Sequence, residues 1–303
     1  MTPGADRRSV LAGLTALGLA GCDRASSSPA SDTEIRVTPG AWDIDLSALE
    51  RANGGRIGLH ARDWNMVSWR ADERFNYCST FKLFLAAATL ERVQRGDERL
   101  DRPIPVVAAD MVSHAPVTEP AVGSALTIEA LCKGVVEVSD NPAANILIRE
   151  LGGLDALRAW YRSIGDQSTT VDRLEPVMNR KDGDKDTITP MQGVTDLIAV
   201  FGSGAIRPRL EPAMLGRLRG WLVDTPTGLN RIKGGLPRGW TVAHKTGTGG
   251  AGQTNDIGVI SPVSGDPIHI AVYYEAPATL SEAQRDAVIA DATRIALKSL
   301  GHD

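Results

Sequence analysis

Three short groups of residues in this chain combine a hydroxyl with an amine or an amide at close spacing. They are Ser79-Thr80-Phe81-Lys82, Ser139-Asp140-Asn141 and Lys245-Thr246-Gly247, in this order along the chain. On a helix, a serine and a lysine three positions apart lie on the same face, so the Lys82 amine can reach the Ser79 hydroxyl and help remove its proton. The first group therefore predicts a nucleophilic serine, although Ser-x-x-Lys is also common in helices whose lysine only faces solvent.

The other two groups have chemical uses and simpler alternatives. Lys245-Thr246-Gly247-Thr248 closes a predicted strand, and its lysine and threonines offer charge and hydroxyls to a carboxylate. Glycine allows a ligand to lie close against the strand edge. A plain strand-to-turn transition would explain the glycine but not the lysine. Ser-Asp-Asn, taken alone, is a common turn and capping string.

A fourth group, Arg173-Leu174-Glu175-Pro176-Val177-Met178-Asn179, places a carboxylate and an amide four residues apart in a loop. A serine ester persists unless a base activates water against it, and Glu175 is a candidate for that base. An isolated Glu-Pro pair is more often an exposed acidic turn. Four such groups in one chain favour the chemical interpretation, a hydrolase that forms and then hydrolyses a serine ester.

Composition and charge point to a small-molecule substrate. The 303 residues are 42% hydrophobic and 23% charged, as in ordinary globular proteins. A net charge of −4 and a pI near 5.8 give no reason to expect a nucleic-acid partner, which needs a clustered basic face. The histidines are scattered without metal-ligand spacing; they are His60, His114, His244, His269 and His302. We expect a monomer that uses neither a metal nor a cofactor.

The N-terminal residues are predicted to be an export signal. Arg7-Arg8 precedes an apolar run over 10–20, which is too short to span a membrane. The pair of arginines suits either the twin-arginine or the ordinary secretory route. Leu19-Ala20-Gly21-Cys22 is similar to a bacterial lipobox, which predicts a signal peptide over 1–21 and lipidation of Cys22. The alternative is an ordinary signal-peptidase site with a chance cysteine.

The polar residues 22–41 are then predicted to form a lipid-anchored, flexible tether. Asp23 directly after the cysteine favours, by resemblance to enterobacterial lipoproteins, retention at the inner membrane. The expected location is therefore the periplasm, with the membrane contacted only through the N-terminal lipid.

Periodicity predicts a sheet whose strands come from both ends of the chain. Alternating patterns predict strands over 56–63, 66–70, 240–245, 255–260 and 268–275. Helical patterns cover 43–53, 82–95, 127–138, 142–151, 154–164, 189–201 and 281–300, and no convincing strand interrupts the helical region. This order describes an α/β domain, 42–78 and 225–303, with an all-α domain, 79–224, inserted in it. A functional cleft is expected between the two domains.

Together these motifs resemble those of the class A serine β-lactamases, over about 42–300. Ser-x-x-Lys, Ser-Asp-Asn and Lys-Thr-Gly occur in these enzymes and in penicillin-binding proteins, whereas the Glu-Pro-x-x-Asn loop is absent from the latter. Other segments similar to the family are 116–119, 141–145, 227–228, 235–237 and 254–257. The resemblance implies an α/β fold of the β-lactamase/transpeptidase type, a five-stranded antiparallel sheet flanked by helices with the all-α domain inserted. It also implies hydrolysis of penicillins and cephalosporins.

The resemblance assigns catalytic roles to individual residues. Ser79 is the nucleophile and Lys82 a proton acceptor beside it, while Glu175 and Asn179 hold the water that hydrolyses the acyl-enzyme. Either Lys82 or Glu175, acting through water, is the base for acylation. Ser139 passes a proton to the departing lactam nitrogen.

The resemblance also assigns substrate-binding roles. Asn141 binds the side-chain amide of the substrate, and Lys245, Thr246 and Gly247 line its carboxylate site. Backbone N–H groups of Ser79 and Thr248 form an oxyanion hole. Arg231 is the candidate carboxylate anchor, since Thr254 stands where many members have an arginine, and Arg285 is a weaker candidate.

Three departures from the family pattern bear on the pocket. His114 replaces the aromatic residue expected before Pro116. His244 stands where aspartate is usual, and simple packing on the strand is the favoured interpretation. The loop between Asn179 and Asp186 is two residues short; by resemblance, Arg173 and Asp186 form the ion pair that closes it.

Cys78 and Cys132 are the cysteines that follow Cys22, so at most one disulfide can form between them. In family members, a cysteine before the active serine bridges to a position where this chain has Gly249. The partner position for Cys132 is Ala86 here. Both thiols are therefore expected to be free.

Two alternative functions share the first three motifs. A penicillin-binding transpeptidase or carboxypeptidase, or a penicillin-sensing lipoprotein, would be acylated on Ser79 without turnover. Neither has a use for the water-holding pair of Glu175 and Asn179, so the fourth motif favours the hydrolase.

Overall fold

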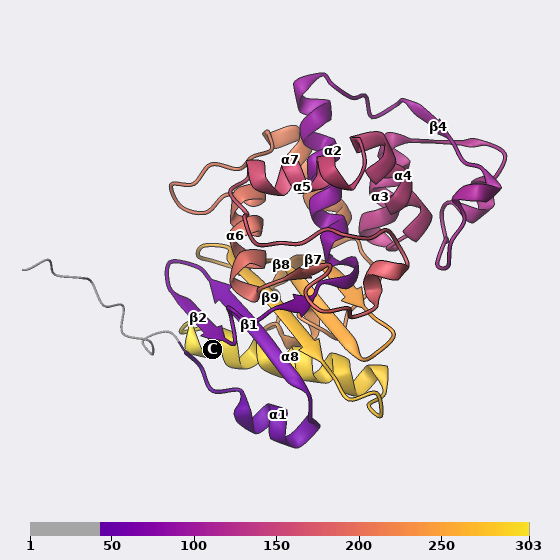
Figure 1. Cartoon of the computed structure of the whole chain (residues 1–303). Helices are drawn as coiled ribbons and strands as arrows, with labels where there is room; N and C mark the ends of the chain where they lie inside the picture. Colours follow the sequence, from indigo (N-terminus) through magenta and orange to yellow (C-terminus); the bar gives the residue numbers. More distant parts are fainter. Residues whose placement is uncertain (1–42, 303) are drawn as a thin grey trace, which may run out of the picture. The chain divides into compact units, whose positions relative to one another are not determined.

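The computed structural model describes residues 43–302 (Figure 1). The predicted signal peptide over 1–21, the lipidation site Cys22 and the tether over 22–41 lie outside the described residues.

A single antiparallel sheet of five strands is built from both ends of the described chain. Its strands stand in the order β2-β1-β9-β8-β7. They are β1 (Arg56–Arg62), β2 (Met66–Trp69), β7 (Thr241–Thr248), β8 (Gln253–Ser261) and β9 (Ile268–Glu275). Strand β1 pairs with β9, so that His60 lies opposite Ala271. The predicted five-stranded antiparallel sheet is confirmed.

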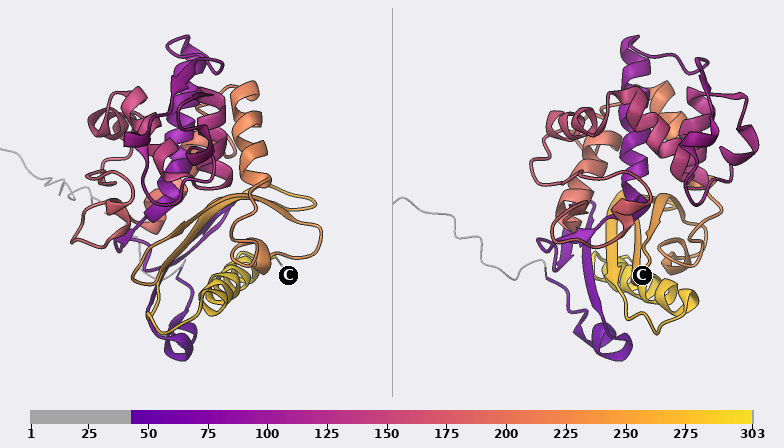
Figure 2. Two further views of the ribbon diagram at one scale, coloured as in Figure 1. Left: turned by 90° about the vertical axis from the view of Figure 1, so that its right-hand side faces the viewer. Right: turned by 45° about the vertical axis from the view of Figure 1, so that its right-hand side comes forward.

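Helices cover both faces of this sheet (Figure 2). One face carries α2 (Phe81–Arg95), α3 (Ile128–Glu137), α4 (Asn141–Leu151), α5 (Leu154–Ser163), α6 (Pro190–Phe201) and α7 (Pro212–Val223). The other carries α8 (Glu282–Ser299), with α1 (Ser47–Asn53) beside it. The division into an α/β domain and an inserted all-α domain stays a prediction, since 43–302 behave as part of one compact unit.

The prediction that no strand interrupts the helical region is wrong. Two short pairs occur there or at its border: β4 (Pro103–Pro105) with β5 (Ala125–Thr127), and β3 (Phe75–Asn76) with β6 (Thr187–Ile188). Pairs of two or three residues are too short to produce an alternating pattern. The prolines of β4 also argue against a strand in the sequence, although an isolated two-stranded ladder tolerates them at its edge.

The helix starts follow local capping chemistry. Thr127, Asp140 and Thr189 each accept the N–H three positions ahead with a side-chain oxygen, which starts α3, α4 and α6. Ser281 and Gln284 form a capping box at the start of α8. The site-forming turns before α4 and α8 are therefore encoded locally.

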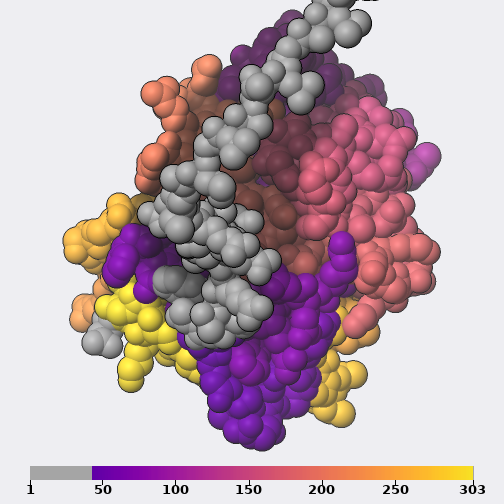
Figure 3. Space-filling model, turned by 60° about the vertical axis from the view of Figure 1, so that its left-hand side comes forward, coloured from indigo at the N-terminus to yellow at the C-terminus, as the bar shows by residue number. Residues whose placement is uncertain are grey.

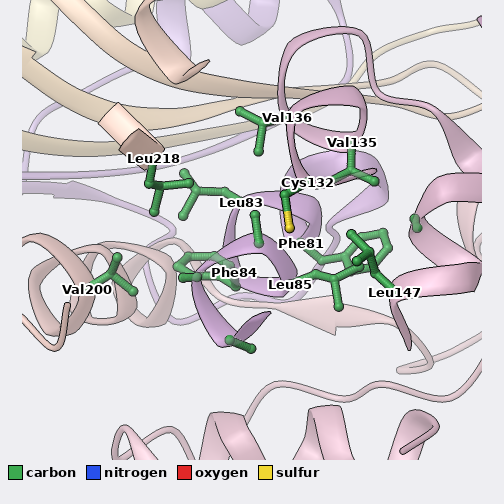
Figure 4. Packing of buried hydrophobic residues seen from close by; sticks show 14 of the residues in the cluster. Phe81, Leu83, Phe84, Leu85, Cys132, Val135, Val136, Leu147, Val200 and Leu218 are labelled. Atoms are coloured by element: carbon green, nitrogen blue, oxygen red, sulfur yellow. The ribbon is translucent and has the colours of Figure 1, made fainter. Parts of the chain in front are cut away.

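Helix α2 is buried along its whole first part. Phe81, Leu83, Phe84 and Leu85 point in different directions from it, toward residues of α3, α4, α6 and α7 (Figure 4). An α-helix that is apolar on every side belongs in the interior, because it has no polar face to present to water. Its N-terminal end is therefore held in place by the packing of four neighbouring helices.

A second apolar core lies on the opposite face of the sheet. Ile57 and Leu59 of β1, Val272 of β9, and Val288 and Ile289 of α8 belong to it. Figure 3 shows the first described residues, in indigo, next to the yellow C-terminal segment. Because β1 and α8 share this core, the two ends of the described chain are packed together.

A buried ion pair connects the loop after α7 to helix α8. Arg231 Nε donates to Asp286 Oδ1 at 2.7 Å, and Arg231 is only 3% exposed. Asp286 Oδ1 thus receives a charged donor inside the protein, and this contact fixes the loop against the helix.

Both cysteines of the described chain are free and buried, as predicted. Burial raises the pKa of Cys132 to about 12 and raises that of Cys78 further. Across 43–302, none of the helices has the length and apolar character needed to cross a bilayer.

The thiols should be unreactive in the folded protein and reactive after unfolding. In a Cys22→Ser chain we expect no labelling of Cys78 or Cys132 under native conditions, because burial shields them and keeps them protonated. Unfolding in denaturant without reductant should release both. Titration with a chromogenic disulfide reagent measures the count, and a denatured chain without free thiols would mean that the two are bridged.

Removing one partner of the Arg231–Asp286 pair should destabilise the fold. Arg231→Met leaves an unpaired buried carboxylate and should lower the free energy of unfolding by about 3–5 kcal/mol. Arg231→Met combined with Asp286→Leu should recover part of this loss, because no charge remains buried. Urea unfolding measures both, and a single variant as stable as the wild type would contradict the assignment.

Candidate active site

Ser79 lies in a short 3₁₀ turn, η1 (Cys78–Thr80), directly before α2. The helix predicted over 82–95 thus begins at Phe81, and Ser79 lies in the turn before it. The turn is held by Thr80, whose N–H and hydroxyl both donate to Tyr77 O. Ser79 lines a cavity of about 630 Å³. The serine is thus presented to a pocket from the end of a buried helix.

Lys82 is buried and surrounded by acceptors. Its Nζ lies 3.0 Å from Glu175 Oε1, 2.5 Å from Asn141 Oδ1 and 2.7 Å from the Ser139 carbonyl oxygen. Burial lowers the pKa of Lys82, and the negative charge of Glu175 opposes that shift. Three of the four sequence motifs therefore meet at one amine.

The Ser79 hydroxyl points to the carboxylate rather than to the lysine. Ser79 Oγ donates to Glu175 Oε1 at 3.4 Å, and the same oxygen contacts Lys82 Nζ. The expected direct approach of the Lys82 amine to this hydroxyl is thus replaced by a contact that both groups make with one carboxylate oxygen. A proton leaving the serine has two neighbouring groups able to take it.

Glu175 is clamped by two asparagines. The Asn145 side chain exchanges two hydrogen bonds of 3.0 Å with the Glu175 backbone, and the Asn179 amide donates to Glu175 Oε2. Asn145 has no role predicted from the sequence. Its spacing in the sequence could have indicated it as a site residue, because Asn145 follows Asn141 by four residues on α4 and so shares a helix face with it.

The loop that carries Glu175 is closed by Arg173 and Asp186. Arg173 Nε lies 2.5 Å from Asp186 Oδ2, and Asp186 Oδ1 accepts the N–H of Asp172 at 2.8 Å. Asn76 Nδ2 donates to the carbonyl oxygens of Asp186 and Met178. The ends of the loop are thereby tied to each other and to β3.

Asp140 organises the turn that holds Ser139 and Asn141. Its carboxylate accepts the N–H groups of Val117, Thr118 and Ala143 at 2.8–2.9 Å. Ser139 has a φ of 60°, in the left-handed region. These contacts tie the turn before α4 to the loop over 113–118.

His114 lies in that loop and lines the cavity. It is exposed, its Nε2 is 2.8 Å from the Val138 carbonyl oxygen, and its own carbonyl accepts the Asn141 N–H. The imidazole is thus anchored at the rim rather than buried in the site.

Strand β7 forms the opposite wall with its outer edge. A side chain at Gly247 would come within 2.7 Å of Tyr77 O and 3.1 Å of Ser79 N, so only glycine permits this approach. Gly249 N donates to Gln253 O, and backbone groups alternate in direction along an antiparallel strand. Thr248 therefore turns its N–H away from β8, toward the open edge of the sheet. With the Ser79 N–H, it supplies two donors for an oxyanion.

Lys245 and Thr246 leave β7 on opposite faces. Lys245 is buried, and its Nζ donates to Thr246 O at 3.0 Å. Burial, reinforced by the neighbouring Lys82 charge, lowers the pKa of Lys245 to about 7. Thr246 lines the cavity and bonds through its hydroxyl to Thr227 at 2.9 Å.

Arg231, the candidate carboxylate anchor, makes several hydrogen bonds within the protein. Arg231 lines the cavity, but Nε is paired with Asp286, and Nη1 donates to the carbonyl oxygens of Gly247 and Asn255. Nη2 donates to Thr248 Oγ1 at 3.0 Å. These contacts use four of the five guanidinium N–H groups. Arg231 thus orients Thr248, and within the described residues a single Nη2 N–H is left for a substrate carboxylate. Arg285, the weaker candidate, does not line this cavity.

His244 is buried beneath the site and bonded to Asp256. Its Nδ1 lies 2.9 Å from both Asp256 oxygens, and Asp256 Oδ2 also accepts the Ile232 N–H. Packing on the strand is thus only part of its role, because this pair also fastens the segment that carries Arg231. Among residues 43–302, no set of three or more His, Cys, Asp or Glu side chains gathers as a metal site would require.

The whole arrangement suits acyl transfer. It combines a serine at a helix end, a buried lysine and carboxylate in contact, two N–H donors at a strand edge, and cationic groups beside the cavity. This combination meets the geometric requirements for forming a serine ester and for hydrolysing it.

Comparison with known proteins agrees with this geometry. A model of the Beta-lactamase enzyme family matches residues 43–300. Beta-lactamase L2 of Stenotrophomonas maltophilia is 39% identical over 85% of both chains. A carbapenem-hydrolysing β-lactamase, KPC, of Klebsiella oxytoca is 40% identical over 84% of this chain and 88% of its own.

Solved structures give the same result. An ancestral class A β-lactamase is 43% identical, with a TM-score of 0.79 over 84% of this chain and 98% of its own. A β-lactamase from Xanthomonas campestris is 38% identical, with a TM-score of 0.78 over 84% of this chain and 96% of its own. The chain therefore belongs to the β-lactamase enzyme family and, within it, to class A.

Proposed function

We propose that this protein hydrolyses penicillins and cephalosporins through an acyl-enzyme on Ser79, and so confers resistance to these antibiotics. The observation that carries the proposal is the placement of Glu175. One of its oxygens contacts Ser79 and Lys82, and the other accepts the Asn179 amide. A carboxylate in this position can serve a base role in both halves of the reaction.

In the first half, Ser79 Oγ attacks the lactam carbonyl. Its proton leaves toward Glu175 Oε1 or, along the same contact, toward Lys82. The N–H groups of Ser79 and Thr248 stabilise the negative oxygen, at about 2.7–4 kcal/mol per donor. The Ser139 hydroxyl, 3.3 Å from Lys82 Nζ, carries a proton to the lactam nitrogen as its bond to carbon breaks.

In the second half, a water between Glu175 and Asn179 attacks the ester carbonyl. Glu175 takes a proton from this water and passes it to Ser79 Oγ as the ester bond breaks, so that Ser79 is released as the hydroxyl. A penicillin-binding or penicillin-sensing protein, the alternative function, stops before this step. A hydrolysis assay with a chromogenic cephalosporin distinguishes the two, because only the hydrolase turns over more than one equivalent.

We propose, further, that the protein is a periplasmic monomer, anchored to the inner membrane by lipidated Cys22. The apolar run over 10–20 and the sequence Leu19-Ala20-Gly21-Cys22 support this proposal. Cys22→Ala should remove lipid labelling and release the protein from the membrane fraction. A labelled or membrane-bound variant would contradict the anchor.

Glu175→Ala should separate the two halves of the reaction. We expect acylation to persist in part and deacylation to stall, because no other carboxylate contacts Asn179 in the described structure. Mass spectrometry after penicillin treatment should then show a lasting adduct on Ser79. Ser79→Ala is the control and should show neither adduct nor hydrolysis. Turnover of Glu175→Ala near the wild-type rate would remove Glu175 from the mechanism.

The activity should depend on the protonation of Lys245. Its lowered pKa of about 7 means that the amine is charged below about pH 7 and neutral above it. Binding of a carboxylate-bearing substrate should weaken as the charge is lost, so kcat/KM should fall as pH rises from about 6 to about 9. Lys245→Arg keeps its charge and should flatten this fall. Profiles that fall equally in both proteins would contradict the assignment.

A further inference from the structure

The cavity that contains Ser79 continues to the first turns of α8. Its wall on that side is formed by Pro226, Leu229, Asn230, Glu282 and Asp286. Glu282 and Asp286 are four residues apart on α8 and so share one helix face. The substrate cavity therefore ends against two carboxylates.

Only one of these carboxylates lacks a cationic partner. Asp286 is paired with Arg231, as described above, and the two charges largely cancel. Within residues 43–302, no ion pair engages Glu282. The first helical position suits a negative charge, which interacts favourably with the helix dipole, but the capping itself is done by Ser281 and Gln284. Glu282 thus presents a free negative charge to the cavity.

The contacts place Glu282 beyond the carboxylate site, as seen from Ser79. Thr248 on β7 bonds to Arg231, Arg231 bonds to Asp286, and Glu282 lies one helical turn from Asp286. A cephalosporin carries a substituent on the ring carbon next to the one that bears its carboxylate. With the carboxylate at Thr246 and Thr248, we expect this substituent to lie toward the α8 end of the same cavity, which Glu282 lines.

The same end of the cavity has an apolar wall. Leu229 is 46% exposed, and Pro226 is exposed beside it in the loop after α7. An apolar surface next to a free carboxylate fits a flat aromatic cation, which can cover Leu229 and place its charge near Glu282. A neutral or anionic substituent gains nothing from the carboxylate.

We propose that Glu282 determines specificity, by favouring cephalosporins whose ring substituent beside the carboxylate is a cationic aromatic group such as pyridinium. This inference rests on the proposed function, and it names a substrate class within it. Glu282 is exposed, so the attraction is screened by solvent and salt. Glu282 is therefore expected to give only a modest preference for the cationic over the neutral cephalosporin.

A matched pair of substrates tests the proposal. Cephaloridine and cephalothin have the same thienylacetamido side chain. On the ring carbon next to the one that bears the carboxylate, cephaloridine carries a pyridinium group and cephalothin a neutral acetate ester. The readout is the ratio of their kcat/KM values in the full-length protein. Glu282→Gln should lower this ratio about twofold to fivefold at low salt, and less at high salt. Glu282→Lys should lower it further.

Asp266→Asn is the matched control, since it removes the same charge from the exposed turn between β8 and β9, outside the cavity. It should leave the ratio unchanged. Circular dichroism verifies that each variant is folded. If both substrates are turned over and the ratio of their kcat/KM values is the same in wild type, Glu282→Gln and Glu282→Lys, the inference about Glu282 is wrong but the proposed function stands. Turnover of neither substrate by the wild type would overturn the proposed function as well.

Discussion

The buried contact between Lys82 and Glu175 is the constraint on which the rest of the structure depends. Both side chains are 0% exposed, and their charged atoms are 3.0 Å apart. Taking two ions out of water costs several kcal/mol each, and this cost is offset only when good geometry and further hydrogen bonds accompany the pair. Asn141 and the Ser139 carbonyl complete the environment of Lys82, while Asn145 secures the backbone at Glu175. The site therefore needs three separate segments at once, namely α2, the turn before α4 and the loop that carries Glu175.

The rigidity of this site comes from the elements on either side of it. Helix α2 is surrounded by apolar neighbours, so Ser79 and Lys82 have little freedom to move relative to the helical region. On the other side, β7 is the outer strand of the sheet and approaches Ser79 at Gly247. A side chain at that position would separate the two walls. The close approach of strand edge and helix end is what makes a pair of N–H donors usable as an oxyanion hole.

The region behind β7 shows how charge is distributed around a carboxylate site. Arg231 is neutralised by Asp286, and His244 is paired with Asp256. Lys245, in contrast, is buried with a backbone carbonyl as its hydrogen-bond partner, so burial shifts its pKa strongly. The paired groups position Thr248 and the loop after α7, whereas Lys245 is the group left to respond to a substrate or to pH.

The sequence by itself determined the chemistry and the outline of the fold. Ser79, Lys82 and Glu175 are indicated as reactive groups by their types and spacing, the resemblance to class A β-lactamases adds Asn179, and the split sheet follows from alternating strands at the two ends of the chain. The five-stranded antiparallel sheet is confirmed, because strand periodicity is a local property of the sequence.

Only the tertiary structure decided how the hydrogen-bonding capacity of each side chain is used. Asn145 is an ordinary helix residue in the sequence, and its clamp on Glu175 exists only because a distant loop lies against α4. Arg231 has the right charge for a substrate carboxylate, but Asp286, two backbone carbonyls and the Thr248 hydroxyl already accept four of its five N–H groups. A sequence specifies which donors and acceptors are present. Which of them remain free for a substrate depends on contacts between segments far apart in the chain.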